Sequence, residues 1–530
     1  MKYALAYDIG TTGVKTCLFE IDEDIKLIAD ANEGYELYVF PDGGAEQDPN
    51  EWWQAMCNTT RKVIKKSKVK PEAIDGISFC SQMQGLVLVD KDGLPVRRAM
   101  SYMDQRAKKE LKKYMSHGVQ VAGGEITKVL KSLKITGAAS VSVKDPVYKY
   151  LWVKDNEPEN YRHVHKWLDV KEALIARMTG EFVMTEDSAF ATLLYDNHEG
   201  KHCWSPEMCK MFSVDMNHLA KIVKSTDLVG KLTKQAAADL GLAEGTAVFG
   251  GGGDASLIGV GAGSVKNHDT HIYMGTSGWV STVVDKSLVD VTAMIAATVG
   301  AQPGLYNYFA ELETAGKCLE WVKDHLALDE IGVYLKKTHV AEDMESQYTN
   351  LYQYMSEVTQ SVPAGSNGVI FTPWLHGNRC PFEDPNAKGM FFNISLETSK
   401  RELIRAVAEG VCFHMRWMLE TEEKKTPTSQ IIRFVGGGAL SDSTSQILAD
   451  CLGRIVETVP SPQNVGAVGA AVIVAVGLGI IDRVDDAGKL IKAEKVFKPN
   501  PANKAAYDKN FEVYKELYKT NKNNFKLING

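Results

Sequence analysis

The chain carries the same short turn twice, at two places far apart in the sequence. Residues 8–19 read DIGTTGVKTCLF, and residues 273–284 read YMGTSGWVSTVV. In both places a strand-like apolar run leads into G-T-[T/S]-G, and a second strand-like run follows. Each copy therefore predicts a β-hairpin with a glycine-flanked loop. Two copies indicate two related halves, and a chain of 530 residues is long enough for two or more domains.

The composition is that of an ordinary globular protein, with 44% hydrophobic and 24% charged residues. A net charge of −7 argues against nucleic acid as a partner. The first residues lack the pattern of a secretory signal, and the apolar run at residues 465–481 is short and glycine-rich, so it predicts a buried helix rather than a membrane span. Nine cysteines without a CxxC pair or a Cys/His grid argue against structural zinc and favour a reduced, cytoplasmic protein. The Lys-rich tail at residues 518–530 is expected to be frayed and solvated.

The first loop consists of four small residues, Gly10, Thr11, Thr12 and Gly13. Backbone N–H groups and threonine hydroxyls in such a loop can surround an anion. A P-loop would need G-x-x-x-x-G-K-[ST] running into a helix, whereas here Val14 separates Gly13 from Lys15 and a strand follows. One such loop alone is most often a plain hairpin turn. The second copy, which begins with Gly275 and Thr276, favours phosphate binding by both.

An aspartate precedes only the first of the two turns. Asp8 has Tyr273 at the matching place in the second copy. A carboxylate beside a phosphate repels it unless a cation lies between them, and Mg²⁺ is the hard cation that binds both kinds of oxygen. Asp8 is therefore predicted to hold Mg²⁺.

A run of four glycines, residues 250–253, leads into Asp254 and a small-residue segment that reads as a helix. Capping that helix is the simplest role for Asp254, and it is compatible with catalysis. The glycine spacing never gives G-x-G-x-x-G, which disfavours a dinucleotide site. Transfer of a phosphoryl group to a hydroxyl needs a base close to the acceptor. Asp254 is the candidate for that base.

Residues 433–459 read as strand, glycine loop, helix and strand. Ser441 and Asp442 are suitable N-caps for the helix. The glycines from Gly436 to Gly438 would leave a flat surface on which a purine ring can lie.

These motifs together resemble those of the FGGY carbohydrate kinases, which share the fold of actin, hexokinase and Hsp70. Four further segments carry the resemblance: AEQDPNEWW at 45–53, SYMDQRA at 101–107, PVYKYLWVKDNEPE at 146–159, and FTPWLHGNRCPFEDPNAKGMFFNI at 371–394. The resemblance implies an α/β protein with two ribonuclease H-like domains, residues 1–245 and 246–530, around a central cleft for ATP and a sugar. The sugar would bind mainly to the first domain.

The resemblance also implies a role for each matching position. Asp8 would hold Mg²⁺, usually through water, and Asp254 would be the general base beside the sugar. The ATP phosphates would lie against Gly10, Thr11, Thr12, Gly13, Lys15, Gly275, Thr276 and Gly316. Adenine and ribose would be bordered by Gly437, Gly438, Ala439 and Asp442. The sugar would be held by Met83, Gln84, Asp104 and Arg106, although a surface or interdomain ion pair is an equally good reading of Arg106.

Within the family the likeness is strongest to the xylulokinase-like branch, which has Met-His-Gly in its sugar loop. This chain has Met83, Gln84 and Gly85 there, so the His is replaced by an uncharged amide. The Arg-Glu-Thr of glycerol kinases is absent. The resemblance thus implies phosphorylation of D-xylulose at O5, by a protein that in many relatives is a homodimer. Ribulose, gluconate or a tetritol as substrate, or an actin-like ATPase without a sugar, stay open.

Overall fold

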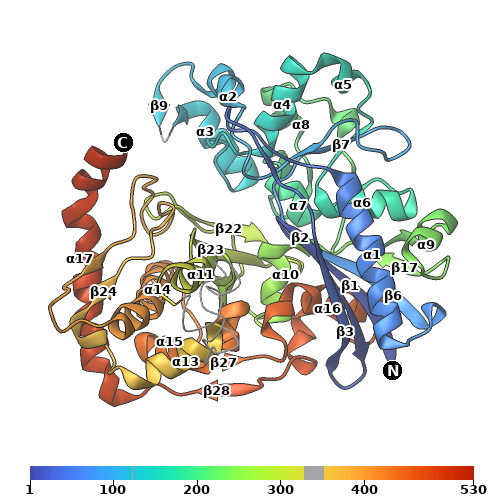
Figure 1. The fold of residues 1–530 in the computed structure, drawn as a ribbon. Helices are drawn as coiled ribbons and strands as arrows, with labels where there is room; N and C mark the ends of the chain where they lie inside the picture. The colour runs from blue at the N-terminus through green and yellow to red at the C-terminus, as the bar shows by residue number, and fades with distance from the viewer. Residues whose placement is uncertain (122, 328–350) are drawn as a thin grey trace, which may run out of the picture.

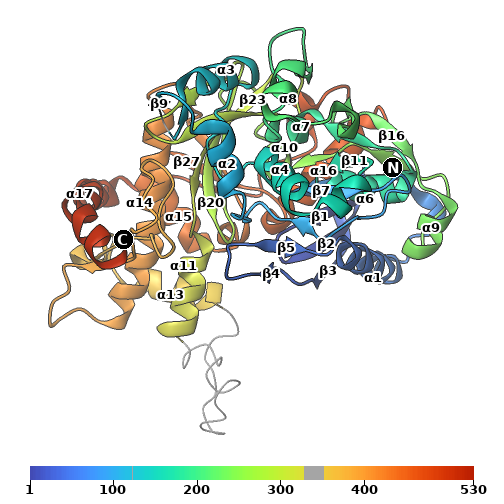
Figure 2. The same ribbon diagram turned by 90° about the horizontal axis from the view of Figure 1, so that it is seen from above.

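The computed structural model describes residues 1–121, 123–327 and 351–530. Within these ranges the chain forms two domains, each built on one large mixed sheet (Figures 1 and 2). In Figure 1 the first domain, blue to green, occupies the top and the right, and most of the second, yellow to red, lies at the lower left. The α/β class and the two-domain organisation expected from the sequence are confirmed.

The first domain has a seven-stranded sheet in the order β16-β17-β6-β1-β2-β3, with β18 also paired to β6. Its strands are β1 (Lys2–Ile9), β2 (Gly13–Ile21), β3 (Ile25–Gly34), β6 (Ile74–Ser81), β16 (Leu228–Lys231), β17 (Ala247–Phe249) and β18 (Gly252–Gly253). Strands β1, β2 and β3 are antiparallel neighbours, whereas β6 runs parallel to β1 and β17 parallel to β6.

The second domain repeats this arrangement. Its eight-stranded sheet has the order β21-β22-β23-β20-β19-β26-β27-β28. The strands are β19 (Thr270–Met274), β20 (Gly278–Val284), β21 (Val289–Asp290), β22 (Ile295–Val299), β23 (Tyr306–Leu312), β26 (Ile431–Val435), β27 (Ile455–Thr458) and β28 (Lys495–Phe497). Strands β19, β20 and β23 are antiparallel neighbours, and β26 and β27 continue the sheet in parallel. Strands β1, β2, β3, β6 and β17 thus correspond to β19, β20, β23, β26 and β27.

Both turns follow directly on the first strand of their sheets. Ile9 pairs with Val14 at the end of the first hairpin and encloses residues 10–13, whereas Met274 pairs with Gly278 and encloses residues 275–277, so the second turn is one residue shorter. Asp8 and Tyr273 are each the last but one residue of the strand that leads into the turn. Both hairpin predictions are confirmed.

Two helices, which pack against each other, connect the two domains. Helix α10 (Asp254–Gly261) follows the last strand of the first sheet, and α16 (Val465–Gly477) comes from the second half of the chain but packs on β6 and β1 (Figure 1). Their backbones touch, since a Cβ atom on Gly469 would lie 2.2 Å from the carbonyl oxygen of Leu257. The glycine-rich run is therefore a buried helix, as predicted. Among the described residues we find no helix with the length and apolarity needed to span a bilayer.

The other helices of the first domain are α1 (Pro49–Ser67), α2 (Lys108–Met115), α3 (Ile126–Thr136), α4 (Pro146–Asn156), α5 (Pro158–Arg162), α6 (Val170–Thr179), α7 (Glu186–Ala191), α8 (Pro206–Phe212) and α9 (Lys234–Leu240). Of these helices, α1 and α6 pack on the sheet of the first domain, and α2, α3, α4, α5 and α8 form the upper part of Figure 1. Short strands join them: β4 (Tyr38–Val39), β5 (Ala45–Gln47), β7 (Val87–Val89), β8 (Ala99–Met100), β9 (Gln120–Val121), β10 (Gly124–Glu125), β11 (Lys166–Leu168), β12 (Val183–Thr185), β13 (Tyr195–Asp196), β14 (Cys203–Trp204) and β15 (Lys221–Val223).

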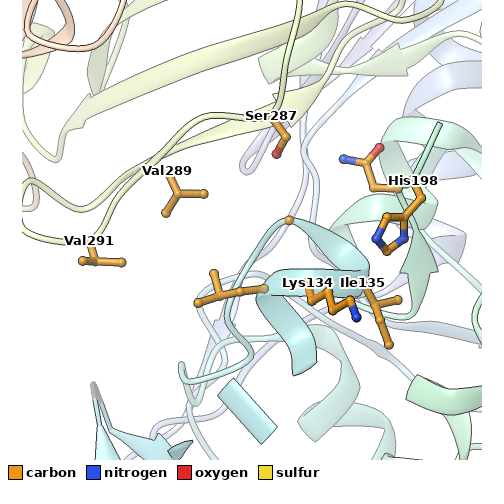
Figure 3. Close-up of a pocket in the computed structure, with 9 residues that line it drawn as sticks. Lys134, Ile135, His198, Ser287, Val289 and Val291 are labelled. Atoms are coloured by element: carbon orange, nitrogen blue, oxygen red, sulfur yellow. The ribbon is translucent and has the colours of Figure 1, made fainter. Parts of the chain in front are cut away.

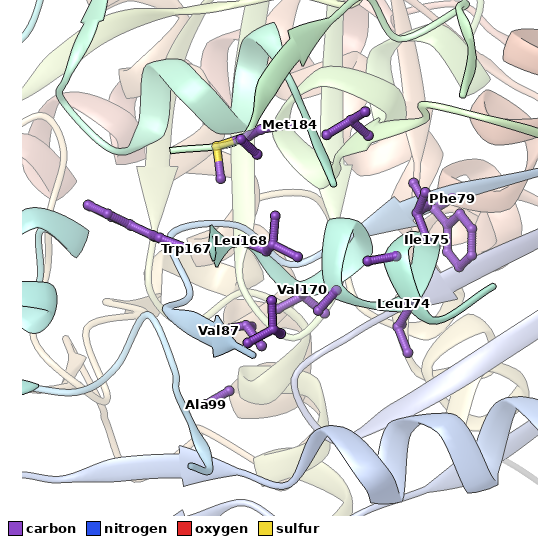
Figure 4. Close-up of a cluster of buried hydrophobic side chains, with 14 of the residues drawn as sticks. Phe79, Val87, Ala99, Trp167, Leu168, Val170, Leu174, Ile175 and Met184 are labelled. Carbon is purple, nitrogen blue, oxygen red and sulfur yellow. The ribbon is translucent and has the colours of Figure 1, made fainter. Parts of the chain in front are cut away.

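The core of the first domain joins its sheet to these helices. Phe79 from β6 lies beside Leu174 and Ile175 of α6, and Trp167 and Leu168 of β11 continue the apolar layer (Figure 4). Burial of such side chains is the main favourable contribution to folding.

The second domain is completed by α11 (Gly316–His325), α13 (Leu351–Ser361), α14 (Lys400–Glu422), α15 (Asp442–Leu452), α17 (Lys504–Asn529), β24 (Ile370–Phe371) and β25 (Phe391–Phe392). The expectation of a frayed tail is wrong, because α17 remains helical to Asn529. Its apolar side packs Tyr507, Phe511 and Tyr514 into the core against Phe413 of α14.

The domain boundary expected after residue 245 stays a prediction. The last strand of the first sheet ends at Gly253, and the first strand of the second sheet begins at Thr270. The change from one sheet to the other therefore lies between these two residues.

Candidate active site

Side chains from three other segments hold the carbonyl groups of the first turn: Tyr35, Gln47 and Gln82. The Tyr35 hydroxyl donates to the Gly13 oxygen at 3.1 Å and also to that of Gly10. Gln82 Nε2 donates to the Gly10 oxygen at 3.1 Å, and Gln47 Oε1 accepts from the same Nε2 at 2.9 Å. These hydrogen bonds to its carbonyl oxygens therefore fix the conformation of the turn.

Both turns keep backbone donors available. Among the residues that the structure describes, no partner is recorded for the N–H groups of Thr11 and Thr12 in the first turn, or of Thr276 and Ser277 in the second. Successive free N–H groups in a turn form an anion-binding concavity. The matched pair of turns thus has the chemistry predicted for phosphate binding.

The second turn is buttressed by the start of α11. Gly316 N–H donates to the Gly275 oxygen at 2.8 Å, and Ala315 N–H donates to the Thr276 oxygen at 3.2 Å. A Cβ atom on Gly316 would lie 2.3 Å from the Gly275 oxygen, so a larger residue would push the turn away. The structure thus brings Gly316 to the second turn, where the resemblance put it.

The segment just before α16 joins the first turn to the glycine loop of the second domain. Lys15 Nζ donates to the Gln463 oxygen at 2.6 Å, and Gly436 N–H donates to the Pro462 oxygen at 2.8 Å. Asn464 follows, with a buried side-chain NH₂ that has no recorded partner. One short segment therefore borders both the first phosphate turn and the expected adenosine loop.

The expected adenosine loop has the local structure that its sequence predicted. A short 3₁₀ turn, Gly437–Leu440, contains three of the four expected residues, and the Ser441 hydroxyl caps α15 by accepting from Thr444 N–H at 3.2 Å. Asp442, the fourth, is the first residue of α15 and pairs with Lys495 at 2.7 Å. Their contact with adenine and ribose stays a prediction.

Asp8 lies near the end of β1, against the start of α16. A Cβ atom on Gly466 would lie 2.9 Å from Asp8 Oδ2, so the helix backbone closes directly on the carboxylate. Burial raises the pKa of Asp8, while the Lys15 ammonium and a hydrogen bond from Cys80 lower it. The charged carboxylate is therefore short of compensating charge, and a cation beside it would supply that charge.

Asp254 is the first residue of α10, and Gly253 is the N-cap, so the expected capping by the Asp254 side chain is wrong. The Asp254 carboxylate accepts instead from the N–H of Ala255 at 2.8 Å. Burial raises the pKa of Asp254 to about 7, Ala255 N–H opposes this, and the charges of Asp8 and Glu311 add to it. A base whose pKa lies near neutral pH is well matched to general-base catalysis.

Tyr273 relates the second turn to the carboxylates of the first domain. Its hydroxyl lies next to Gly275 in the second domain, since a Cβ atom there would come 2.2 Å from it. Burial raises the pKa of Tyr273, and the carboxylates of Asp8 and Asp254 raise it further. Two carboxylates of the first domain therefore act on the strand that leads into the second turn.

A buried ionic cluster holds the backbone next to Asp254. Lys171 Nζ lies 2.6 Å from Glu172 Oε1 and 3.8 Å from Asp187 Oδ1, and all three side chains are buried. Asp187 Oδ2 accepts from Gly253 N–H at 2.7 Å. The backbone just before the candidate base is thus anchored to the first domain. Nothing in the sequence singles out Asp187, because it lies in the polar run Thr185–Ser188 beside Glu186.

The expected sugar loop lies beside Asp254. Met83 packs on Gly253 so closely that a Cβ atom there would lie 2.0 Å from its sulfur. Gln84 follows with a left-handed backbone, at φ +61°. The structure therefore brings the loop to the candidate base, as the resemblance implied.

Asp104 and Arg106 belong to a buried charge network. The Asp104 carboxylate accepts from Ala45 N–H at 2.9 Å and from Arg106 at 2.7 Å. Arg106 also pairs with Glu46 at 2.6 Å and stacks 4.4 Å from the Trp152 ring. Arg106 is thus ion-paired, but the pairs are buried within the first domain rather than at the surface or between domains, and sugar contact by Asp104 and Arg106 stays a prediction.

A cavity of about 470 Å³ opens between the domains at a different place (Figure 3). Its walls are α3 and Asn197–His198 of the first domain, and Ser287, Val289 and Val291 of the second. None of the expected site residues line it.

Comparison with known proteins agrees with this arrangement. Residues 3–261 match the family model "FGGY family of carbohydrate kinases, N-terminal domain", and residues 271–478 match the corresponding C-terminal domain. The xylulose kinase of Bacillus subtilis (strain 168) is 28% identical over 520 residues, 98% of this chain and 97% of that protein.

Two solved structures from Lactobacillus acidophilus have the same fold. A ligand-bound xylulose kinase superposes with a TM-score of 0.84 at 26% identity, covering 100% of both chains. A gluconate kinase superposes with a TM-score of 0.81 at 26% identity, covering 98% of both. The family models span both domains and include both turns and Asp254. The chain belongs to the FGGY family of carbohydrate kinases, and it is a sugar kinase.

Proposed function

We propose that this kinase transfers the γ-phosphoryl group of ATP to O5 of D-xylulose and releases ADP and D-xylulose 5-phosphate. The observation that carries the proposal is the position of Asp254, beside the sugar loop and separated from Asp8 by the single strand β6. Similarity to xylulose kinases over nearly the whole chain supports the choice of sugar.

Phosphoryl transfer needs alignment and charge neutralisation more than covalent help from the protein. The free N–H groups of the two turns would hold the phosphates from opposite walls. As the sugar hydroxyl attacks the γ-phosphorus, Asp254 accepts its proton, a new O–P bond forms, and the bond to the ADP oxygen breaks. Gly316, Lys15 and the 437–442 loop position the nucleotide.

Asp8 is the proposed Mg²⁺ ligand. Among the described residues there is no group of three His, Cys, Asp or Glu side chains that could hold a metal. This fits an ion that takes one carboxylate and completes its shell with phosphate oxygens and water, as Mg²⁺ commonly does. When bound, Mg²⁺ neutralises phosphate charge.

A sugar acid is the second candidate substrate. The gluconokinase of Bacillus subtilis (strain 168) is 27% identical over 492 residues, and Gln84 replaces the His that the xylulokinase-like branch has in its sugar loop. A homodimer and a cytoplasmic location also stay proposals.

An ADP-release assay over ketoses, polyols and sugar acids tests the function. We expect release to depend on added sugar, with D-xylulose the best substrate by kcat/KM. Preference for gluconate would establish the second candidate, and equal ADP release without any sugar would contradict the kinase proposal.

The pH profile should follow the ionisation of Asp254. A base must be deprotonated to accept a proton, and burial raises the pKa of Asp254 to about 7. Since kcat/KM reports the free enzyme, we expect it to rise through about pH 7 and to fall about tenfold per unit below it. The measurement is direct detection of sugar phosphate across pH. A flat profile through that range would contradict the assignment.

Gln84→Ala should weaken sugar binding selectively. Loss of one hydrogen bond to a sugar hydroxyl is expected to raise the sugar KM about tenfold, with the ATP KM nearly unchanged. Gln54→Ala, an exposed glutamine of α1, is the matched control. Equal increases in both KM values would contradict a sugar-specific role for Gln84.

A further inference from the structure

The peptide group between Gln84 and Gly85 is held at both ends by charged side chains. Its carbonyl oxygen accepts from Lys149 Nζ at 2.8 Å, and its N–H donates to Asp169 Oδ1 at 3.0 Å. Lys149 comes from α4, and Asp169 immediately precedes α6. Two separate helices of the first domain therefore fix the orientation of one peptide plane.

Lys149 is unusual because its side chain has no exposed surface. Burial lowers the pKa of Lys149 to about 8, and the nearby carboxylates of Asp104, Asp169 and Asp145 favour its charged form. A buried ammonium is costly unless it is hydrogen-bonded and paired. The buried Lys149 ammonium donates to a backbone carbonyl of the sugar loop. The same hydrogen bond therefore offsets part of the cost of burying Lys149 and fixes the loop.

The loop needs such support. Gln84 has φ +61°, a conformation that a non-glycine residue holds only when its surroundings impose it. Asp169 also crowds Gly85, since a Cβ atom there would lie 2.8 Å from Asp169 Oδ1. On the other side, Met83 rests on Gly253, next to Asp254. The clamped peptide therefore determines the direction of the Gln84 side chain relative to the candidate base.

We infer that Lys149, with Asp169, clamps the Gln84–Gly85 peptide and is a positioning residue for sugar recognition, acting through Gln84. This inference rests on the proposed function, because it assigns Lys149 to the sugar half of the same site.

Lys149→Met removes the ammonium and keeps the length of the side chain. We expect the sugar KM to rise about tenfold or more, as for Gln84→Ala, while the ATP KM changes less than about twofold. Lys154→Met is the matched control, because Lys154 lies on the same helix and donates to the Ser213 carbonyl at 2.8 Å, away from the loop. That variant should leave both KM values unchanged.

A double-mutant cycle separates positioning from general damage. If Lys149 acts through Gln84, the double variant Lys149→Met/Gln84→Ala should have the same sugar KM as Gln84→Ala alone. The inference would be overturned if the increase in sugar KM of the double variant were the product of the two single increases. It would also be overturned if Lys149→Met raised the sugar and ATP KM values equally. Should Lys149→Met fail to fold, Lys149→Gln keeps a polar end and carries the same cycle.

Hydrogen exchange tests the clamp without any substrate. The Gly85 amide should be protected in the unmodified protein, and it should exchange at least about tenfold faster in Lys149→Met but not in Lys154→Met. An unchanged rate in Lys149→Met would overturn the clamp even if the kinase activity is confirmed. Faster exchange in a protein that phosphorylates no sugar would support the clamp and place the failure in the proposed function.

Discussion

Asp254→Asn lowers the turnover number by about two to four powers of ten and leaves ATP affinity near normal. The amide keeps the shape of the side chain and can still accept from the N–H of Ala255, but it cannot take the proton of the sugar hydroxyl. Single-turnover formation of sugar phosphate, together with nucleotide titration, measures both quantities.

Asp269→Asn is the matched control for this variant. Asp269 accepts from the N–H groups of Val265 and Lys266, in the loop just after α10, and has no role in the proposed chemistry. Its activity should match that of the unmodified protein. If Asp254→Asn retained most of its turnover, Asp254 would not be the base.

The melting temperature of the Asp254→Asn variant should stay the same or rise, because the substitution removes a carboxylate whose charge is disfavoured by burial.

Asp8→Asn raises the Mg²⁺ concentration needed for half-maximal rate by about 10- to 100-fold and slows turnover by a similar factor. Asp8 lies two residues before the first turn, and α16 packs against its carboxylate from the second half of the chain. Replacing it with an amide removes the negative charge that would attract the cation. A Mg²⁺ titration of ADP release at saturating sugar measures the shift.

Asp75→Asn is the corresponding control, since its carboxylate accepts from Tyr3 N–H at the opposite end of β1. This variant should show the unmodified Mg²⁺ dependence. An unchanged Mg²⁺ requirement in Asp8→Asn, with normal turnover, would show that another group holds the cation.

Much of the site could be predicted because its parts are local in sequence. The two G-T-[T/S]-G turns and the strands around them need only short-range pattern, and Asp8 and Tyr273 are each the last but one residue of the strand before the turn. The helix at Val465–Gly477 likewise follows from its continuous small, apolar sequence.

The supporting contacts could not be predicted in this way, because they join residues far apart in the chain. Tyr35 and Gln82 hold the first turn from other segments, and Lys149 reaches the sugar loop across 65 positions. Nothing in the local sequence of a lysine in a helix tells which carbonyl it will meet. Tertiary structure alone brings these groups together.

For the C-terminal tail the expectation from the sequence was wrong. Its lysines and asparagines suggested fraying, but Phe525 is buried and the helix continues almost to the end of the chain. The apolar residues Tyr507, Phe511 and Tyr514 recur at helical spacing and anchor the earlier turns. Once these turns are packed, each further residue adds a hydrogen bond without a new nucleation cost.

In the proposed mechanism the two turns hold one triphosphate from opposite walls, with a cation on the Asp8 side alone. A crystal structure of the protein with a non-hydrolysable ATP analogue and Mg²⁺ is the decisive test. We expect phosphate oxygens within hydrogen-bond distance of the N–H groups of both Thr12 and Thr276, and Mg²⁺ between the phosphates and Asp8. A nucleotide bound away from either turn, or a metal far from Asp8, would contradict the mechanism.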